Sequence, residues 1–159
     1  MNKKCIMIAC AFFVAVALQA KVSLPAFFSD GMVMQQQSQA SLWGNASKGK
    51  IVEVTTGWDG QTYTTRADEQ GKWKLTVQTP AAGGPYDITF DDGERTRIKD
   101  ILMGELWICS GQSNMEMPMK GFKNQPVEDA NMDVLRSRNS QIRLFTVKRN
   151  SQFAPVDDV

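Results

Sequence analysis

The strict alternation of apolar and polar residues in two short stretches is the feature that most restricts the fold. Lys72–Gln78 and Tyr86–Phe90 both repeat with a period of two, which is typical of a strand with one buried and one solvated face. Turn residues such as Asp59-Gly60 and Asp92-Gly93 bound further, less regular stretches. These also predict strands: Met32–Gln35, Ser41–Trp43, Lys50–Thr56, Gln61–Arg66 and Thr96–Ile101. Their spacing predicts a β-sandwich-like domain over residues 21–101.

The pattern changes after residue 101. Leu106–Cys109 is a continuous apolar run, typical of a strand buried on both faces of a parallel sheet. Pro126–Arg138 has one apolar face, with acidic residues early and basic residues late, which favours a helix. Ile142–Val147 reads as another strand, so the three segments predict one βαβ unit. One unit cannot bury a parallel sheet, so we expect an α/β fold class in which residues 102–159 begin a truncated parallel-sheet α/β domain.

Residues 1–20 have the layout of a secretory signal peptide. Lys3 and Lys4 give a basic start, Ile6–Leu18 is an almost unbroken apolar run, and a small residue follows at a cleavage position. The run is short for a stable membrane span, and an uncleaved anchor is the alternative. Cleavage would leave Cys109 alone, without an internal disulfide. The sequence therefore predicts a periplasmic or secreted protein of bacterial type.

The charge balance and the absence of histidine limit the possible functions. With 18 basic and 17 acidic residues the net charge is +1, so composition gives no attraction to nucleic acid or to an anionic membrane. The sequence has no histidine, which is the usual general base of a serine hydrolase. Hydrolytic machinery that begins here must be completed outside these residues, and we expect the 159 residues alone to be inactive.

Ser113 is the candidate nucleophile. It follows the apolar run Leu106–Cys109 in a predicted sharp turn, at the sheet edge where α/β folds bind ligands. Gly111 allows the backbone to turn tightly, and a backbone N–H in such a turn can face a developing oxyanion. Met115 occupies the place of the second glycine of a nucleophile elbow, which argues against the ordinary α/β-hydrolase family.

Three segments resemble the sialate O-acetylesterases, carbohydrate esterases of the SGNH hydrolase superfamily. Gly104–Glu116 (GELWICSGQSNME) resembles the family's first conserved block, Leu24–Gln35 its opening, and Ile142–Val147 the strand after its first helix. The resemblance implies that Ser113 is the nucleophile and that its own N–H is one oxyanion donor. It also implies that the Gly, Asn and His blocks lie beyond this sequence. The implied substrate is O-acetylated sialic acid or a related acetylated glycan, and neither a metal nor an organic cofactor is required.

Other residues have structural interpretations that we favour over functional ones. We expect Cys109 to be a buried structural thiol, and we expect the methionines at 115, 117 and 119 to line an apolar wall rather than bind Cu(I). Trp58 is predicted to pack across a hairpin rather than to stack on a sugar, and the acidic residues around Gly93 to form a turn rather than a calcium site. The alternative function is that of a non-catalytic carbohydrate-binding or truncated β-domain protein.

Overall fold

The computed structural model describes residues 21–148, 151–154, 156 and 158, so the predicted signal peptide lies outside the described residues. Every strand predicted between residues 32 and 101 is confirmed. The strands are β1 (Val33–Gln35), β2 (Gln39–Asn45), β3 (Ile51–Thr56), β4 (Thr62–Arg66), β5 (Lys72–Gln78), β6 (Gly83–Asp91) and β7 (Arg95–Gly104). The bounds of β5 are those that the alternation predicted.

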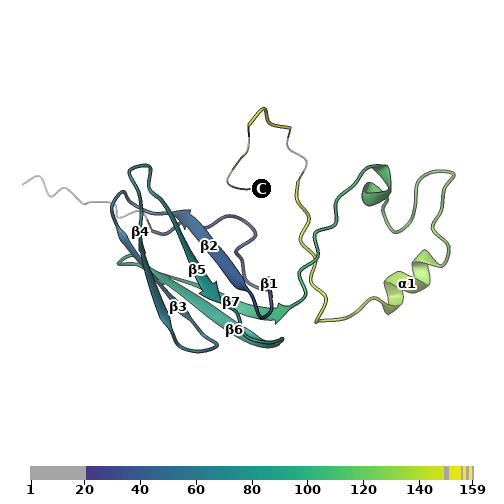
Figure 1. The fold of residues 1–159 in the computed structure, drawn as a ribbon. Coiled ribbons are helices and arrows are strands. Elements are labelled where there is room, and N and C mark those ends of the chain that lie inside the picture. Colours follow the sequence, from purple (N-terminus) through teal and green to yellow (C-terminus); the bar gives the residue numbers. More distant parts are fainter. Residues whose placement is uncertain (1–20, 149–150, 155, 157, 159) are drawn as a thin grey trace, which may run out of the picture.

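The described strands form two sheets. A curled five-stranded sheet has the order β1-β7-β6-β3-β4, and β2 pairs with β5 in a separate antiparallel sheet (Figure 1). Within the larger sheet only the β1–β7 pair is parallel. Parallel neighbours cannot be joined by a tight hairpin, and here the chain passes through five other strands between β1 and β7.

One hydrophobic core joins the two sheets. The larger sheet contributes Val54, Ile88 and Phe90, and the smaller sheet contributes Leu42 and Val77; all five side chains are fully buried. Trp73 of β5 lies against Phe90 of β6, with ring centroids 5.9 Å apart. Full burial of one such side chain contributes roughly 1.5–3 kcal/mol. This core is therefore the main source of stability in the part of the chain that contains β1 to β7, which we call the β-rich part.

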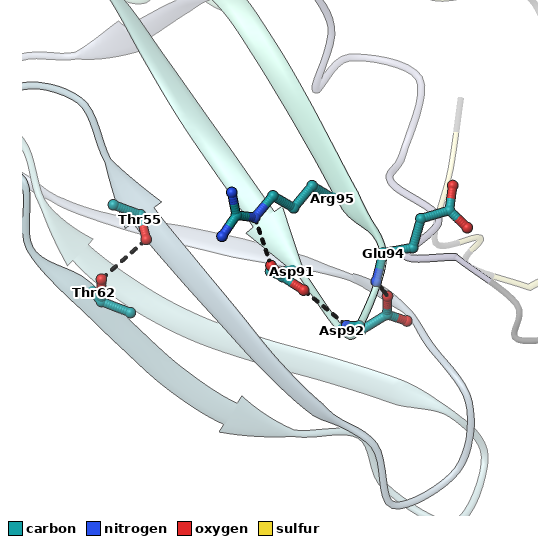
Figure 2. A network of polar contacts seen from close by, with 7 residues as sticks. Thr55, Thr62, Asp91, Asp92, Glu94 and Arg95 are labelled. Atoms are coloured by element: carbon teal, nitrogen blue, oxygen red, sulfur yellow. Dashed lines mark hydrogen bonds and ion pairs between the residues drawn. The ribbon is translucent and has the colours of Figure 1, made fainter.

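The hairpin between β6 and β7 shows how the turn residues act (Figure 2). Gly93 has a φ of 107°, which favours glycine. Its N–H donates to Asp91 Oδ1 at 2.8 Å, and Arg95 Nε donates to Asp91 Oδ2 at 2.9 Å. The Gly93 bond first, and Arg95 second, hold the pKa of the Asp91 carboxyl below its ordinary value. The predicted turn around Gly93 is therefore confirmed.

On the neighbouring strands β3 and β4, the hydroxyl oxygens of Thr55 and Thr62 lie 3.0 Å apart and form a hydrogen bond across the strand pair (Figure 2).

The segment after β7 differs from the prediction. Leu106–Cys109 and Ile142–Val147 are not strands, and their apolar side chains face solvent, with Ile108 90% and Leu144 92% exposed. A strand satisfies its backbone groups only beside another strand, and neither segment is paired in the part of the chain that the structure describes. The apolar runs indicate that these residues favour burial, but a strand also needs a second strand to pair with, and the described residues offer none.

The predicted helix is also shorter than expected. It spans Ala130–Arg136 (α1) instead of beginning at Pro126, because Asp129 has a left-handed backbone with a φ of 53°, which a continuous helix cannot contain. Ala130 is the buried residue of α1, while Leu135 of the predicted apolar face is 75% exposed. Within the described ranges no helix has the length and apolar character needed to cross a membrane. The structure is thus mostly β-strand with few helices, which is consistent with an α/β class.

We expect Gly44→Ala to destabilise the β-rich part by about 1–3 kcal/mol, the usual cost of overpacking. A Cβ at Gly44 would lie 2.4 Å from the Ser23 carbonyl oxygen and 3.1 Å from the Trp73 ring, and the former belongs to rigid backbone. The measurement is the urea midpoint of each protein. Gly104→Ala is the matched control, because its Cβ would meet only Val33 Cγ1 at 3.9 Å. Equal losses in both variants would contradict this prediction.

Candidate active site

Ser113 begins a single 3₁₀ turn, η1 (Ser113–Glu116), in the segment that leaves the sheets. The Met115 N–H donates to the Gln112 carbonyl at 2.9 Å and closes the turn. The Ser113 side chain is exposed, and among the described residues no hydrogen bond to its hydroxyl is found. The predicted sharp turn is present, whereas the buried strand expected before it is not. Ser113 is therefore accessible to solvent and does not support the described core.

Gly111 has a steric role in this turn. A Cβ at Gly111 would lie 2.6 Å from Met115 Cγ, because the Met115 side chain folds back over it. Glycine at position 111 therefore leaves room for the Met115 side chain. Its φ is not positive, so its role here is steric and not conformational. Met115, which replaces the second glycine of a nucleophile elbow, is the residue that makes this contact.

A polar contact that the sequence patterns did not indicate holds the start of the Gly104–Glu116 block. Gln36 Nε2 donates to Glu105 Oε1 at 2.8 Å, and Gln35 Nε2 donates to Glu105 Oε2 at 3.2 Å. Gln35 Oε1 in turn accepts from the Leu106 N–H at 2.9 Å. Both carboxylate oxygens of Glu105 are thus bound by the last residue of β1 and the residue after it. We call the contact among Gln35, Gln36 and Glu105 the exit contact, because it lies where the chain leaves β7.

The exit contact should weaken in acid. The hydrogen bonds from Gln36 and then from Gln35 hold the pKa of Glu105 below its ordinary value. A carboxyl whose pKa is lowered in the bound state stabilises that state above its unbound pKa, about 4.3 for glutamate, and this stabilisation disappears as the pH falls through the lowered value. Both partners are neutral amides, so Glu105 is the group that titrates. We expect hydrogen-exchange protection of the Leu106 amide, corrected for the intrinsic rate, to fall below about pH 4.

Nuclear magnetic resonance at a series of pH values measures this protection directly. Glu105→Gln is the control, because it removes the titrating carboxyl, so that any protection left at Leu106 should no longer depend on pH in this range. Protection of Leu106 that stays constant from about pH 7 to about pH 3 in the original protein would contradict the assignment to Glu105.

The remaining sequence candidates have mixed outcomes. Cys109 is exposed, so the prediction of a buried thiol is wrong; the reason is that the apolar run around it has no neighbouring strand in this structure. Met115 and Met119 are about half exposed, at 51% and 53%, and do not form a buried wall. Trp58 packs edge-on against Tyr86, with ring centroids 6.1 Å apart, and its Nε1 donates to the Gln78 carbonyl. These partners belong to β6 and β5, so Trp58 has a packing role, but not across the β3–β4 hairpin in which it lies.

Among the described residues no group of three or more His, Cys, Asp or Glu side chains is placed to hold a metal ion. A hollow of about 590 Å³ lies over β2 and β5, where Trp43, Asn45 and Lys74 are among its lining residues. None of the residues that line this hollow belongs to the Gly104–Glu116 block. This hollow therefore lies apart from the block that carries Ser113.

Comparison with known proteins relates this chain to carbohydrate esterases. It is 27% identical over 143 residues to the sialate O-acetylesterase of Mus musculus, and 29% identical over 131 residues to that of Homo sapiens. These matches cover 84% and 76% of this chain. A crystal structure of a carbohydrate acetylesterase from Xanthomonas citri superimposes with a TM-score of 0.68 at 32% identity and covers 76% of this chain. The chain is sialate O-acetylesterase-like.

The sialate O-acetylesterase-like chain corresponds to a part of each relative. It spans about a quarter of their length, 26% of the mouse protein, 24% of the human protein and 26% of the Xanthomonas protein. No family model matches the sequence. The resemblance that the three sequence segments indicated is confirmed, and the role of Ser113 remains a prediction.

Proposed function

We propose that this chain supplies the nucleophile of a carbohydrate O-acetylesterase, with Ser113 as the attacking residue. The observation that carries the proposal is the similarity, over three quarters or more of the chain, to proteins named as sialate O-acetylesterases. The exposed hydroxyl of Ser113 in a tight turn supports it. The proposed substrate is an O-acetyl ester on sialic acid or on a related glycan.

The proposed chemistry proceeds in two steps. Ser113 Oγ loses its proton to a general base and attacks the acetyl carbonyl carbon, with the Ser113 N–H as one oxyanion donor. The tetrahedral intermediate collapses, the bond from carbon to the sugar oxygen breaks, and that oxygen takes the proton from the same base. Water then attacks the acetyl-serine in the same manner, releases acetate and restores the Ser113 hydroxyl.

The base of this reaction has to come from outside the 159 residues, because they contain no histidine. We propose that the two sheets form a β-sandwich-like domain and that residues 102–159 begin an SGNH-type parallel-sheet domain. The large apolar side chains exposed at Trp107, Ile108 and Leu144 support this, since a parallel sheet buries such residues on both faces. By the full-length protein we mean this sequence together with any further chain that its gene encodes.

Export of the protein remains part of the proposal. The basic start and apolar run of residues 1–20 support a cleaved signal peptide and a periplasmic or secreted location. The amino-terminal sequence of the protein purified from its host decides this point, because cleavage near Ala20 would leave a chain that begins near Lys21.

The experiment that tests the enzymatic proposal measures acetate release from O-acetylated sialic acid by the full-length protein and by its Ser113→Ala variant. Release that depends on Ser113 supports the esterase. Binding of acetylated glycan without any acetate release would favour the alternative, a non-catalytic carbohydrate-binding protein.

A further inference from the structure

The segment from Asp30 to Gln36, which contains β1, lies against the end of β7. It runs parallel to the end of β7, with Val33 opposite Leu102 and Gln35 opposite Gly104. It therefore lies beside the point at which the chain leaves the β-rich part toward Ser113 (Figure 1). At its far end, Gln35 and Gln36 make the exit contact with Glu105.

The near end of the same segment organises a bulge in β7. Tyr86 and Ile88 of β6 lie opposite Ile101 and Ile98, so two steps along β6 correspond to three along β7. The extra residue belongs to the stretch between Ile98 and Ile101, where Asp100 has a left-handed backbone with a φ of 58°. Asp30 Oδ1 accepts from the Lys99 N–H at 2.7 Å and holds this bulge in place.

Arg143 binds the bulge. Its guanidinium donates to both the carbonyl oxygen and the side chain of Asp100, with 3.0 Å from Nη2 to Oδ1. The Arg143 side chain is 21% exposed, so most of it is covered. Gly31 lies against it, since a Cβ there would be 3.5 Å from Arg143 Nη1. We call the contact between Asp100 and Arg143 the return contact, because it holds the chain where it comes back from α1.

We propose that Glu105 and Arg143 are positioning residues that fix the two ends of the segment carrying Ser113 against the Asp30–Gln36 segment and the bulge it supports. Glu105 lies eight residues before Ser113, and Arg143 lies thirty residues after it. A contact at one end alone would leave the segment free to swing about that point, whereas contacts at both ends restrict its orientation. This inference rests on the proposed function, because positioning matters only if Ser113 must meet a base and an oxyanion site at a defined distance.

The test compares Glu105→Gln, Arg143→Ala and Arg143→Lys in the full-length protein. Glutamine at position 105 keeps one acceptor oxygen but turns an NH₂ group toward a donating Gln amide. We expect kcat on p-nitrophenyl acetate to fall about 10- to 100-fold for Glu105→Gln and Arg143→Ala, with KM little changed, since misplaced reacting groups lower kcat. Lysine keeps the charge but not the two-pronged geometry, so Arg143→Lys should be intermediate.

Hydrogen exchange of residues 105–116 and 140–148 is the second readout, and we expect it to accelerate while β3 and β6 remain protected. Glu69→Gln is the matched control: it removes another exposed carboxylate, paired with Lys48 in the β-rich part, and should change neither readout. Unchanged kcat in both Glu105→Gln and Arg143→Ala would overturn the inference, as would unchanged exchange in both segments. If even the unmutated protein lacks Ser113-dependent activity, the proposed function fails, and the exchange measurement alone then decides whether these residues hold the segment.

Discussion

Replacing Ser113 by alanine in the full-length protein is expected to lower kcat for acetate release by at least about a thousandfold. The variant has no hydroxyl to form the acetyl-serine, so the covalent route is closed. Only oxyanion stabilisation and substrate binding would remain, and in serine hydrolases these account for a small residual rate.

The same substitution should leave the fold unchanged. Ser113 is exposed, it starts a turn closed by the Met115 and Gln112 main chains, and it contributes nothing to the described core. Exposed substitutions of this kind usually change stability by less than about 0.5 kcal/mol. Acetate release from O-acetylated sialic acid, measured beside a thermal melt, separates loss of chemistry from loss of structure.

Ser110→Ala provides the matched control for this experiment. Ser110 belongs to the same block, is also exposed, and differs from Ser113 in lying outside the 3₁₀ turn. We expect it to retain activity within a few-fold of the original protein. Near-normal acetate release by Ser113→Ala would refute the assignment of the nucleophile, and equal losses in both variants would show that the block needs both hydroxyls.

The β-rich part could be predicted from the sequence because its information is local. In Lys72–Gln78 each apolar residue points to the core and each polar one to solvent, so the period of two is visible without knowledge of the partner strand. The turns are equally local, as the Gly93 backbone and the Asp91 side chain illustrate. The strands that pair with one another also all lie between residues 33 and 104, so each strand finds its partner within the described residues.

The segment around Ser113 shows where such prediction ends. The apolar run Leu106–Cys109 indicates a tendency to be buried, but a strand also needs a neighbour, and the described residues provide none. The exit contact was missed for another reason. It joins Glu105 to Gln35 and Gln36, which precede it by 70 and 69 positions in the sequence. These polar side chains show no periodic pattern from which the contact could be predicted. Gln35 and Glu105 did lie in the two segments that resemble the esterase family, which was the available signal.

The last prediction concerns the order of the 159-residue chain itself. We expect amides in the centre of β3 and β6 to exchange at least about a thousandfold more slowly, relative to intrinsic rates, than those of 107–110 and 142–147. A domain of this kind has a free energy of unfolding of about 0.05–0.15 kcal/mol per residue, so roughly 80 residues give about 4–12 kcal/mol. Each 1.4 kcal/mol slows exchange about tenfold for amides that open only by global unfolding.

The contrast follows from the contacts at each position. Val54 and Phe90 are opposed residues in the β3–β6 ladder, and both are fully buried beneath the second sheet. Ile108 and Leu144 face solvent and belong to no described strand, so local opening there requires no loss of core packing. Hydrogen exchange read by mass spectrometry compares the two regions in one sample. Stronger protection in 106–147 than in 50–90 would show that the segment after β7 forms a stable unit by itself, which would contradict this prediction.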